Sequence, residues 1–327
     1  MPKPLLAIVT PVLNDWQSLE VLIRNLAKVE ALQAYAVTVV AVDDGSASID
    51  LNEPNLIEGC INQICIVQLK ANQGHQRAIA LGLAYVDANL APEHIIVMDS
   101  DGEDAPEAID HLLAEADAHP GALIAAQRAK RSEGMVFRAG YQIYKLVFRY
   151  LTGKPISFGN FSLIPGHRLP NVIYNSGIWN NFAATLLKSR LPLRFVPTER
   201  GKRYHGQSTM NYTSLMIHGF SAISVFTDVV IGRIISLLVL ATFATAIAIT
   251  GIVIAKLGGA FVPGYATTVI LFLVSMLLLC LFTGFLLILS LLAERESASA
   301  LPAGLLSHHV RDVVKVRKEA TPAVVKL

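Results

Sequence analysis

Two long stretches without a charged residue lie near the C-terminal end, and they constrain the fold more than any other feature. One runs from Ile234 to Ala255 and the other from Leu257 to Ala293, with Lys256 between them. A helix needs about 20 apolar residues to cross the hydrocarbon core of a bilayer, whereas soluble helices are apolar on one face only. We therefore expect two transmembrane helices, at about residues 234–255 and 266–293. A buried helical hairpin of a soluble protein fits these stretches less well, because they are apolar all round.

The charges that flank these stretches predict an orientation. Arg203 and Arg233 precede the first stretch and four bases between residues 311 and 318 follow the second, whereas Lys256 alone lies near the connecting loop. Positive residues stay on the cytoplasmic side, and the short apolar run from Leu5 to Val9 is not a signal peptide. We expect an integral membrane protein whose N-terminal domain, tail and both termini are cytoplasmic.

Residues 1 to about 225 alternate strand and helix patterns, which is typical of a parallel α/β sheet flanked by helices. The expected strands are Leu5–Thr10, Val37–Val42, Cys65–Gln68, Ile95–Met98 and Ala122–Ala126, and the expected helices are Ser18–Ala31, Gln76–Ala88 and Glu107–Ala118. We expect this domain over residues 1–210, a juxtamembrane interfacial helix over 211–230, the two spans over 231–293 and a cytoplasmic tail over 294–327.

Polar motifs follow three of the expected strands: Pro11-Val12-Leu13-Asn14-Asp15, Asp43-Asp44-Gly45-Ser46 and the run Asp99–Asp104. Ligands of parallel sheets bind beyond the carboxyl ends of the strands, so these motifs indicate one site. No GxGxxG and no GxxxxGK[ST] follows a strand, which disfavours a dinucleotide-binding fold and a P-loop enzyme. A net charge of only +2 argues against a nucleic-acid-binding protein, and the three cysteines form no zinc-binding pattern.

The third motif lies in a block of the sequence that has no basic residue. From Ala78 to Gln127 there are ten carboxylates and no Lys or Arg. Alternate residues of an extended chain point to one side, so Asp99, Asp101 and Glu103 can converge. Carboxylates that converge repel one another unless a proton or a cation lies between them, and oxygen ligands suit Mg²⁺ or Mn²⁺. The alternative is a solvated acidic turn that caps the following helix.

Two basic stretches follow this block, at residues 128–154 and 188–203, and each contains a single acidic residue. Attraction to anionic lipid headgroups explains such stretches, at about 1 kcal/mol per residue. A site for a lipid-borne phosphate explains them as well, because the arginine fork binds phosphate with two hydrogen bonds. The sequence leaves both interpretations open.

The motifs, together with Asn72-x-Gly74-His75, resemble glycosyltransferase family 2, whose members have the GT-A fold. The segment Arg203-x-x-Gly206-x-Ser208, followed by two spans, is similar to polyprenyl-phosphate glycosyltransferases of the dolichol-phosphate mannose synthase and bactoprenol glucosyltransferase type. The resemblance covers nearly the whole chain to about residue 293. It implies a nucleotide-sugar-binding, mostly parallel sheet flanked by helices, with a C-terminal two-helix transmembrane hairpin.

The resemblance also implies roles for individual residues. It places a UDP- or GDP-linked sugar donor at Pro11, Asn14, Asp15, Asp43, Asp44, Asn72, His75 and Asp99. It places Mg²⁺ or Mn²⁺ at Asp101 and Glu103, and it makes Asp99, Asp101 and Arg203 the catalytic residues. The phosphate of a lipid acceptor would face Arg128, Arg131, Arg138, Arg203 and Ser208.

Four positions depart from the family pattern. Asp15 replaces the usual Glu, Glu103 replaces a Gln, and Thr209 replaces a phosphate-binding Lys. The usual Asp-Phe-Arg-Leu segment begins with Asn160, which removes a carboxylate from the acceptor end. A sugar hydroxyl needs a general base to react, whereas a phosphate monoester is already anionic near pH 7. The departure at Asn160 therefore favours a phosphate as the nucleophile, although a carboxylate such as Asp104 remains an alternative base.

We expect a membrane-anchored, metal-dependent inverting glycosyltransferase that moves a hexose from a nucleotide sugar to a polyprenyl phosphate at the cytoplasmic face. The alternatives are a different lipid or lipid-linked saccharide acceptor and a scaffold that has lost catalysis. A processive polysaccharide synthase is disfavoured, because neither Trp16 nor Trp179 lies in a QxxRW segment. A homo-oligomer is left open. The tail Leu301–Leu327 is compatible with a subunit contact, a membrane-surface segment or disorder.

Overall fold

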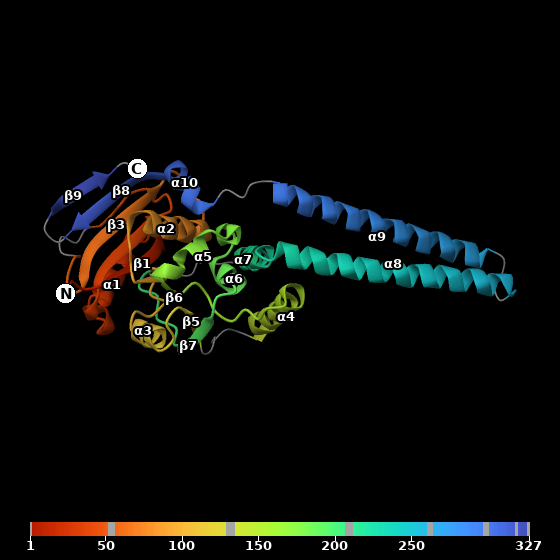
Figure 1. Cartoon of the computed structure of the whole chain (residues 1–327), viewed down its shortest axis with the longest axis horizontal. Helices are drawn as coiled ribbons and strands as arrows, with labels where there is room; N and C mark the ends of the chain where they lie inside the picture. The colour runs from red at the N-terminus through yellow and green to blue at the C-terminus, as the bar shows by residue number, and fades with distance from the viewer. Residues whose placement is uncertain are drawn as a thin grey trace. The chain divides into compact units, whose positions relative to one another are not determined.

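The computed structural model describes residues 2–51, 56–128, 135–206, 212–259, 264–296, 301–317 and 320–325. The chain divides into two compact units (Figure 1). The first unit contains Met1–Arg149, Lys154–Val225 and Ala300–Leu327, and the second contains Tyr150–Gly153 and Phe226–Ser299. The strands and the shorter helices belong to the first unit, and the two longest helices belong to the second.

In the described part of the chain, nine strands form one sheet in the order β7-β5-β6-β4-β1-β2-β3-β8-β9. Their bounds are β1 Leu5–Val12, β2 Ala36–Asp43, β3 Ile61–Leu69, β4 His94–Val97, β5 Leu123–Arg128, β6 Ser162–Pro165, β7 Leu193–Thr198, β8 Val310–Arg317 and β9 Ala320–Val325. Strands β4, β1, β2 and β3 pair in parallel, as do β5 and β7. Strand β6 pairs antiparallel with both β4 and β5.

The sheet reverses its strand order at β1, which lies between β2 on one side and β4 on the other. The carboxyl ends of these three strands meet at the edge where a doubly wound sheet binds ligands. The neighbouring antiparallel strand β6 starts at that edge, because Ser162 pairs with Val97 at the end of β4. The topology therefore brings the start of β6 to the same edge as the polar strand-end motifs.

Helices cover both faces of the sheet (Figure 1). The helices of the first unit are α1 Trp16–Leu26, α2 His75–Asn89, α3 Ala108–Ala118, α4 Met135–Thr152, α5 Leu169–Ile173, α6 Phe182–Lys188, α7 Tyr212–Ser224 and α10 Pro302–His309, of which α4 ends in the second unit. One core packs α1 and α3 against the sheet, and the other packs α2, α5, α6 and α10. A Cβ atom at Gly82 of α2 would lie 2.6 Å from the Val9 side chain, so this helix approaches the sheet closely.

The five strands expected from the sequence are confirmed, within a few residues at their ends, and so are the helices at 76–88 and 107–118. The helix expected over Ser18–Ala31 is present but ends at Leu26, and Ala31 begins a separate 3-10 turn. Four strands were not expected. Strand β6 has only four residues, and β7 carries Arg194 and Pro197 in place of a continuous apolar run. The mostly parallel sheet flanked by helices is the expected fold.

The C-terminal segment extends this sheet. Strand β8 pairs antiparallel with β3, and β9 pairs with β8. Val310 and Val313 are buried, and the backbone N–H of Lys70 donates to the carbonyl oxygen of His309 at 2.8 Å. The segment from 301 is thus part of the sheet of the first unit, an arrangement that the sequence analysis did not consider for this tail.

The second unit contains two long apolar helices, α8 Thr227–Leu257 and α9 Tyr265–Glu296, which pack as a pair. Windows of α8 and of Ala266–Ser290 have mean hydropathies of 2.5 and 2.8, and only 6% and 0% of these windows is buried. Core helices of soluble proteins are mostly buried, so α8 and α9 are candidate membrane spans. Helix α8 begins at Thr227, seven residues before the expected span, and α7 ends at Ser224 rather than at residue 230.

We predict that Val313→Ala destabilises the first unit, because Val313 is fully buried where β8 joins the sheet. Removing two buried methyl groups costs about 2 kcal/mol. For a unit of this size, that cost lowers the melting temperature by about 4 to 8 °C. Val316→Ala, at a partly exposed position of the same strand, should have a smaller effect. Equal melting temperatures for wild type and Val313→Ala, measured by differential scanning fluorimetry, would contradict this role of β8.

Candidate active site

The polar strand-end motifs meet at the edge formed by β1, β2 and β4. Asn14 and Asp15 follow β1, Asp43 ends β2, and the acidic loop from Asp99 to Asp104 follows β4. The hydroxyl of Ser100 donates to the carbonyl oxygen of Pro11 at 3.2 Å, which connects the loops after β4 and β1. The structure therefore brings together the three motifs that the sequence analysis assigned to one site.

Hydrogen bonds hold the loops after β1 and β2 together. The backbone N–H of Asn14 donates to Ser46 Oγ at 2.8 Å, and Asn14 Oδ1 accepts from the N–H of Ala47 at 3.0 Å. Asn14 adopts a left-handed backbone conformation, with φ of 52°, which Asn tolerates better than most residues. Asp43 accepts from the N–H of Ser46 at 2.8 Å. Asn14 and Asp43 thus fix the conformation of the loops that follow β1 and β2.

Asp44 holds the loop that precedes α2. Its carboxylate oxygens accept from the backbone N–H groups of Gln73 at 2.6 Å and Gly74 at 2.9 Å. Burial raises the pKa of Asp44, although these two hydrogen bonds lower it. Gly45 lies against the same loop, since a Cβ atom there would be 2.9 Å from the backbone nitrogen of Asn72. The geometry makes Asp44 a support for the Asn72–His75 segment.

A backbone strap, residues 200–204, covers the acidic loop. The N–H of Gly201 donates to the carbonyl oxygen of Glu103 at 2.9 Å, and the N–H of Tyr204 donates to that of Asp101 at 2.8 Å. Gly102 permits this approach, because its φ is +88° and a Cβ atom would lie 2.8 Å from the carbonyl oxygen of Lys202. The sequence analysis did not find this strap, because periodicity does not indicate pairing between such distant segments.

The strap brings two arginines to the acidic loop. Arg203 Nη1 lies 3.4 Å from Asp101 Oδ2, and Arg200 Nη2 lies 2.6 Å from Glu103 Oε1. Burial raises the pKa of Asp101, and the charges of Asp99 and Glu103 raise it further, whereas Arg203 lowers it. The pKa of Asp101 thus lies above its usual value although Arg203 is beside it.

A divalent cation fits this donor set. The carboxylates offer oxygen ligands, which Mg²⁺ and Mn²⁺ prefer. Burial and the charges of Asp99 and Glu103 raise the pKa of Asp101, and a cation bound there would offset both effects. Among the described residues, no three His, Cys, Asp or Glu side chains form a preformed cage. Mg²⁺ commonly takes one or two carboxylates together with substrate phosphates. Glu103, one of the two expected cation ligands, is paired with Arg200, so Asp101 is better placed than Glu103 to bind the cation.

His75 lies at the start of α2 beside the acidic loop. Its Nε2 is 3.2 Å from Asp99 Oδ1 and 2.9 Å from Asn160 Nδ2. Burial lowers the pKa of His75, but the carboxylates of Asp99, Asp104 and Asp101 raise it by more, so it lies above its usual value. Asn160, which the sequence analysis noted for its missing carboxylate, is thus a neighbour of His75.

The expected acceptor residues are only partly described. Arg203 lies at Asp101, Arg128 ends β5 and Arg138 lies on α4, with the side chains of Arg128 and Arg138 outside the described part. Arg131 and Ser208 lie outside the described residues.

His218 is another residue near the site that the sequence analysis did not select. Burial lowers the pKa of His218 on α7, the charge of His75 lowers it further, and Asp99 raises it. These interactions place His218 within electrostatic range of the His75–Asp99 pair. No pattern in the sequence distinguished it from the other histidines.

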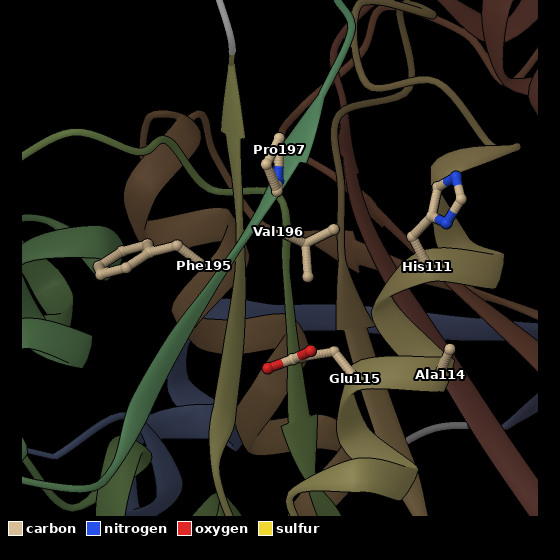
Figure 2. Close-up of a pocket in the computed structure, with 6 residues that line it drawn as sticks. All are labelled: His111, Ala114, Glu115, Phe195, Val196 and Pro197. Carbon is tan, nitrogen blue, oxygen red and sulfur yellow. The ribbon is translucent and has the colours of Figure 1, made fainter.

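A shallow pocket lies apart from this site, between α3 and β7. Figure 2 shows its lining side chains on these two elements: His111, Ala114, Glu115, Phe195, Val196 and Pro197. None of the strand-end residues lines it, and Glu115 is paired with Arg194 at 3.3 Å. We assign no part of the site to this pocket.

We predict that Gly102→Ala disrupts the site, because a side chain at this position collides with the strap. Gly121→Ala is the matched control: its φ of +84° is equally left-handed, but its nearest neighbours are at 3.5 Å. Both variants carry the cost of a left-handed alanine, about 1 kcal/mol. Gly102→Ala should have the lower melting temperature and should lose activity, whereas Gly121→Ala should keep it. Equal effects of the two variants would show that contact with the strap is unimportant.

Comparisons with known proteins agree with this geometry. The profile of Glycosyl transferase family 2 matches residues 7–177. An uncharacterized glycosyltransferase of Synechocystis sp. is 28% identical over 283 residues, which cover 81% of this chain and 83% of that protein. The undecaprenyl-phosphate 4-deoxy-4-formamido-L-arabinose transferase of Yersinia enterocolitica is 28% identical over 159 residues, 47% of this chain and 46% of that protein. The chain thus matches about half the length of this second relative.

Among solved structures, glucosyl-3-phosphoglycerate synthase of Mycobacterium tuberculosis, in complex with Mn²⁺, UDP-glucose and phosphoglyceric acid, has the same fold. The TM-score is 0.50 at 14% sequence identity, over 69% of this chain and 80% of that chain. The family profile covers more than half of the chain and the acidic strand-end site is in place. The protein therefore belongs to glycosyltransferase family 2, has the GT-A fold, and is distantly homologous to an undecaprenyl-phosphate sugar transferase.

Proposed function

We propose that the protein is a membrane-anchored, metal-dependent inverting glycosyltransferase that moves a hexose from a nucleotide sugar to a polyprenyl phosphate at the cytoplasmic face. The observation that carries the proposal is the pairing of Asp101 with Arg203 at 3.4 Å, in a chain that also has two candidate membrane spans. An anion-binding group thus lies directly beside the carboxylate proposed for the metal. The Yersinia relative, whose name specifies undecaprenyl phosphate, supports the same acceptor class.

The donor occupies the edge of β1, β2 and β4 in this proposal. Pro11, Asn14, Asp15 and Asp43 bind the nucleoside, and Asp101 with Asp99 holds a Mg²⁺ or Mn²⁺ ion at the diphosphate. When bound, the cation stabilises the negative charge that develops on the leaving diphosphate. The Mn²⁺ and UDP-glucose in the mycobacterial synthase complex are compatible with this class of donor.

The transfer is a single displacement. An oxygen of the acceptor phosphate attacks the anomeric carbon, the bond from that carbon to the diphosphate oxygen breaks, and the diphosphate leaves with the electron pair. The configuration at the anomeric carbon inverts, and a sugar phosphodiester forms. A phosphate monoester carries one to two negative charges at pH 7, so no side chain has to remove a proton. An amide at position 160 is compatible with such an acceptor.

The surface of the catalytic unit supports a lipid acceptor. Helices α4 and α7 expose large apolar side chains: Ile143, Leu146 and Val147 on α4, and Met216, Ile217 and Phe220 on α7. The two helices are in contact, since a Cβ atom at Gly219 would lie 2.9 Å from the Tyr144 ring. Helix α4 also carries Lys145 and Arg149. Apolar and basic residues on surface helices are typical of segments that lie in the membrane interface.

A transfer assay tests the proposal. The purified protein is incubated with Mn²⁺, undecaprenyl phosphate and each of a panel of radiolabelled UDP- and GDP-sugars, and the lipids are then extracted. We expect label in the lipid fraction that mild acid releases, because a sugar phosphodiester of this kind is acid-labile. Acid-stable lipid label would indicate a glycerolipid or saccharide acceptor instead. Absence of both transfer and donor hydrolysis would indicate a scaffold without catalysis.

We predict that Asp101→Asn reduces transfer by about two to three orders of magnitude, the usual effect of removing one transition-state-stabilising group. The substitution keeps the shape of the side chain and removes the charge that binds the cation. Asp117→Asn, on the exposed face of α3, is the matched control and should retain activity. Turnover of Asp101→Asn near that of wild type at saturating Mn²⁺ would refute the metal assignment.

Arg203 gives a second prediction. In the proposed complex the cation neutralises Asp101, so Arg203 can turn to the acceptor phosphate. A hydrogen bond to a charged group contributes about 1.5 to 3 kcal/mol, so Arg203→Ala should lower the acceptor's kcat/KM by about 10- to 150-fold. Arg203→Lys should restore only part of this, because an ammonium lacks the planar fork. An equal fall in nucleotide-sugar affinity would instead assign Arg203 to the donor.

A further inference from the structure

The strap is attached to the acidic loop on both sides of Arg203. On one side, the backbone N–H of Gly201 donates to a carbonyl oxygen of the loop at 2.9 Å. On the other side, the backbone N–H of Tyr204 donates to the carbonyl oxygen of Asp101 at 2.8 Å. The position of Arg203 therefore depends on both attachments, and the second of them belongs to the residue directly after it.

The side chain of Tyr204 strengthens the second attachment. Its ring lies against Gly102, since a Cβ atom at Gly102 would be 2.8 Å from two of the ring carbons. The ring also packs against the core that contains α1. The hydroxyl oxygen of Tyr204 accepts a hydrogen bond from Asn25 Nδ2 of α1 at 3.1 Å. This one side chain thus connects the strap to the acidic loop and to a helix that precedes it by 179 residues.

Helix α1 is a firm support for the hydroxyl of Tyr204. Four side chains of α1 are fully buried in the core: Leu19, Leu22, Ile23 and Leu26. Asn25 lies on the same helix, so the direction of its amide group follows from the packing of the helix. The strap itself belongs to no helix and no strand of the sheet, and its conformation therefore depends on contacts of this kind.

We propose that Tyr204 is a positioning residue, supported by Asn25, and that it holds Arg203 in the direction in which the acceptor phosphate is bound. The guanidinium fork binds a phosphate only in a defined orientation. Arg203 Nε donates to the carbonyl oxygen of His205 at 3.1 Å, so the fork is attached to its own segment and moves with the strap. The role of Arg203 rests on the proposed function, whereas the anchoring of the strap by Tyr204 does not.

Four variants separate the hydroxyl contact from general effects on the fold. Tyr204→Phe removes the hydroxyl and keeps the ring, and Asn25→Leu removes its partner. Asn25→Asp keeps a hydrogen bond, because the hydroxyl of Tyr204 can donate to a carboxylate. Tyr35→Phe is the matched control. Tyr35 packs against the same core, but it directly precedes β2, at the opposite end of the parallel strands from the strap.

Hydrogen–deuterium exchange of the full-length protein in micelles tests the anchor without any substrate. The amides of Gly201 and Tyr204 exchange when the strap leaves the loop, at a rate that follows this local opening. We expect the peptide that contains residues 200–204 to exchange about five- to tenfold faster in Tyr204→Phe and Asn25→Leu, the effect of one lost hydrogen bond. Asn25→Asp and Tyr35→Phe should exchange at the wild-type rate. Unchanged exchange in Tyr204→Phe, or equally fast exchange in Tyr35→Phe, would overturn the proposal.

A double-mutant cycle with the substrates found in the transfer assay tests the link to Arg203. Tyr204→Phe should raise the KM of the acceptor about three- to tenfold and leave the KM of the donor unchanged. In an Arg203→Ala background the same substitution should have no effect, because residues that act through one another are not additive. An equal effect in both backgrounds would refute the positioning role. Absence of any transfer would refute the proposed function, and the exchange rates would still decide whether Tyr204 anchors the strap.

Discussion

The contact between the acidic loop and the strap at residues 200–204 is the constraint on which the site depends. Two backbone hydrogen bonds, from Gly201 and Tyr204, hold the strap on the loop, and Gly102 leaves the space for it. This contact joins the loop after β4 to the segment after β7, which are about 100 residues apart in the chain. It places Arg203 beside Asp101 and makes one site out of an acidic and a basic part of the sequence.

The contact between the acidic loop and the strap also brings opposite charges together. The parallel strands bring carboxylates together at one edge of the sheet, where burial and mutual repulsion raise the pKa of Asp101. Arg200 Nη2 lies 2.6 Å from Glu103 Oε1, whereas Arg203 Nη1 lies at the longer distance of 3.4 Å from Asp101 Oδ2. In the proposed function, a cation at Asp101 would relieve this repulsion and would leave Arg203 available to an anion. The proposed donor diphosphate and acceptor phosphate would then occupy adjacent parts of one site.

The sequence predicted those features that arise from local pattern. Runs of Val and Ile gave the five parallel strands, and the polar residues that follow them gave the strand-end motifs, because β1, β2 and β4 end at one edge. Long-range pairing was not predictable in this way: β8 pairs with β3 across some 240 residues, and Asn160 joins Gln76 and His75. These contacts depend on which segments the fold brings together, and neither periodicity nor composition carries that information.

We expect the acidic edge to bind a divalent cation tightly only together with the substrate diphosphate, because Mg²⁺ commonly takes one or two carboxylates and substrate phosphates, and the described residues form no preformed cage. Electron paramagnetic resonance of free Mn²⁺, titrated with the full-length protein, tests this claim most directly. The account predicts weak Mn²⁺ binding by the protein alone, and binding at least about tenfold tighter when UDP or GDP is present. In Asp101→Asn, this gain in Mn²⁺ binding with UDP or GDP is expected to be lost. Tight binding without a nucleotide, or no gain with either nucleotide, would contradict the account.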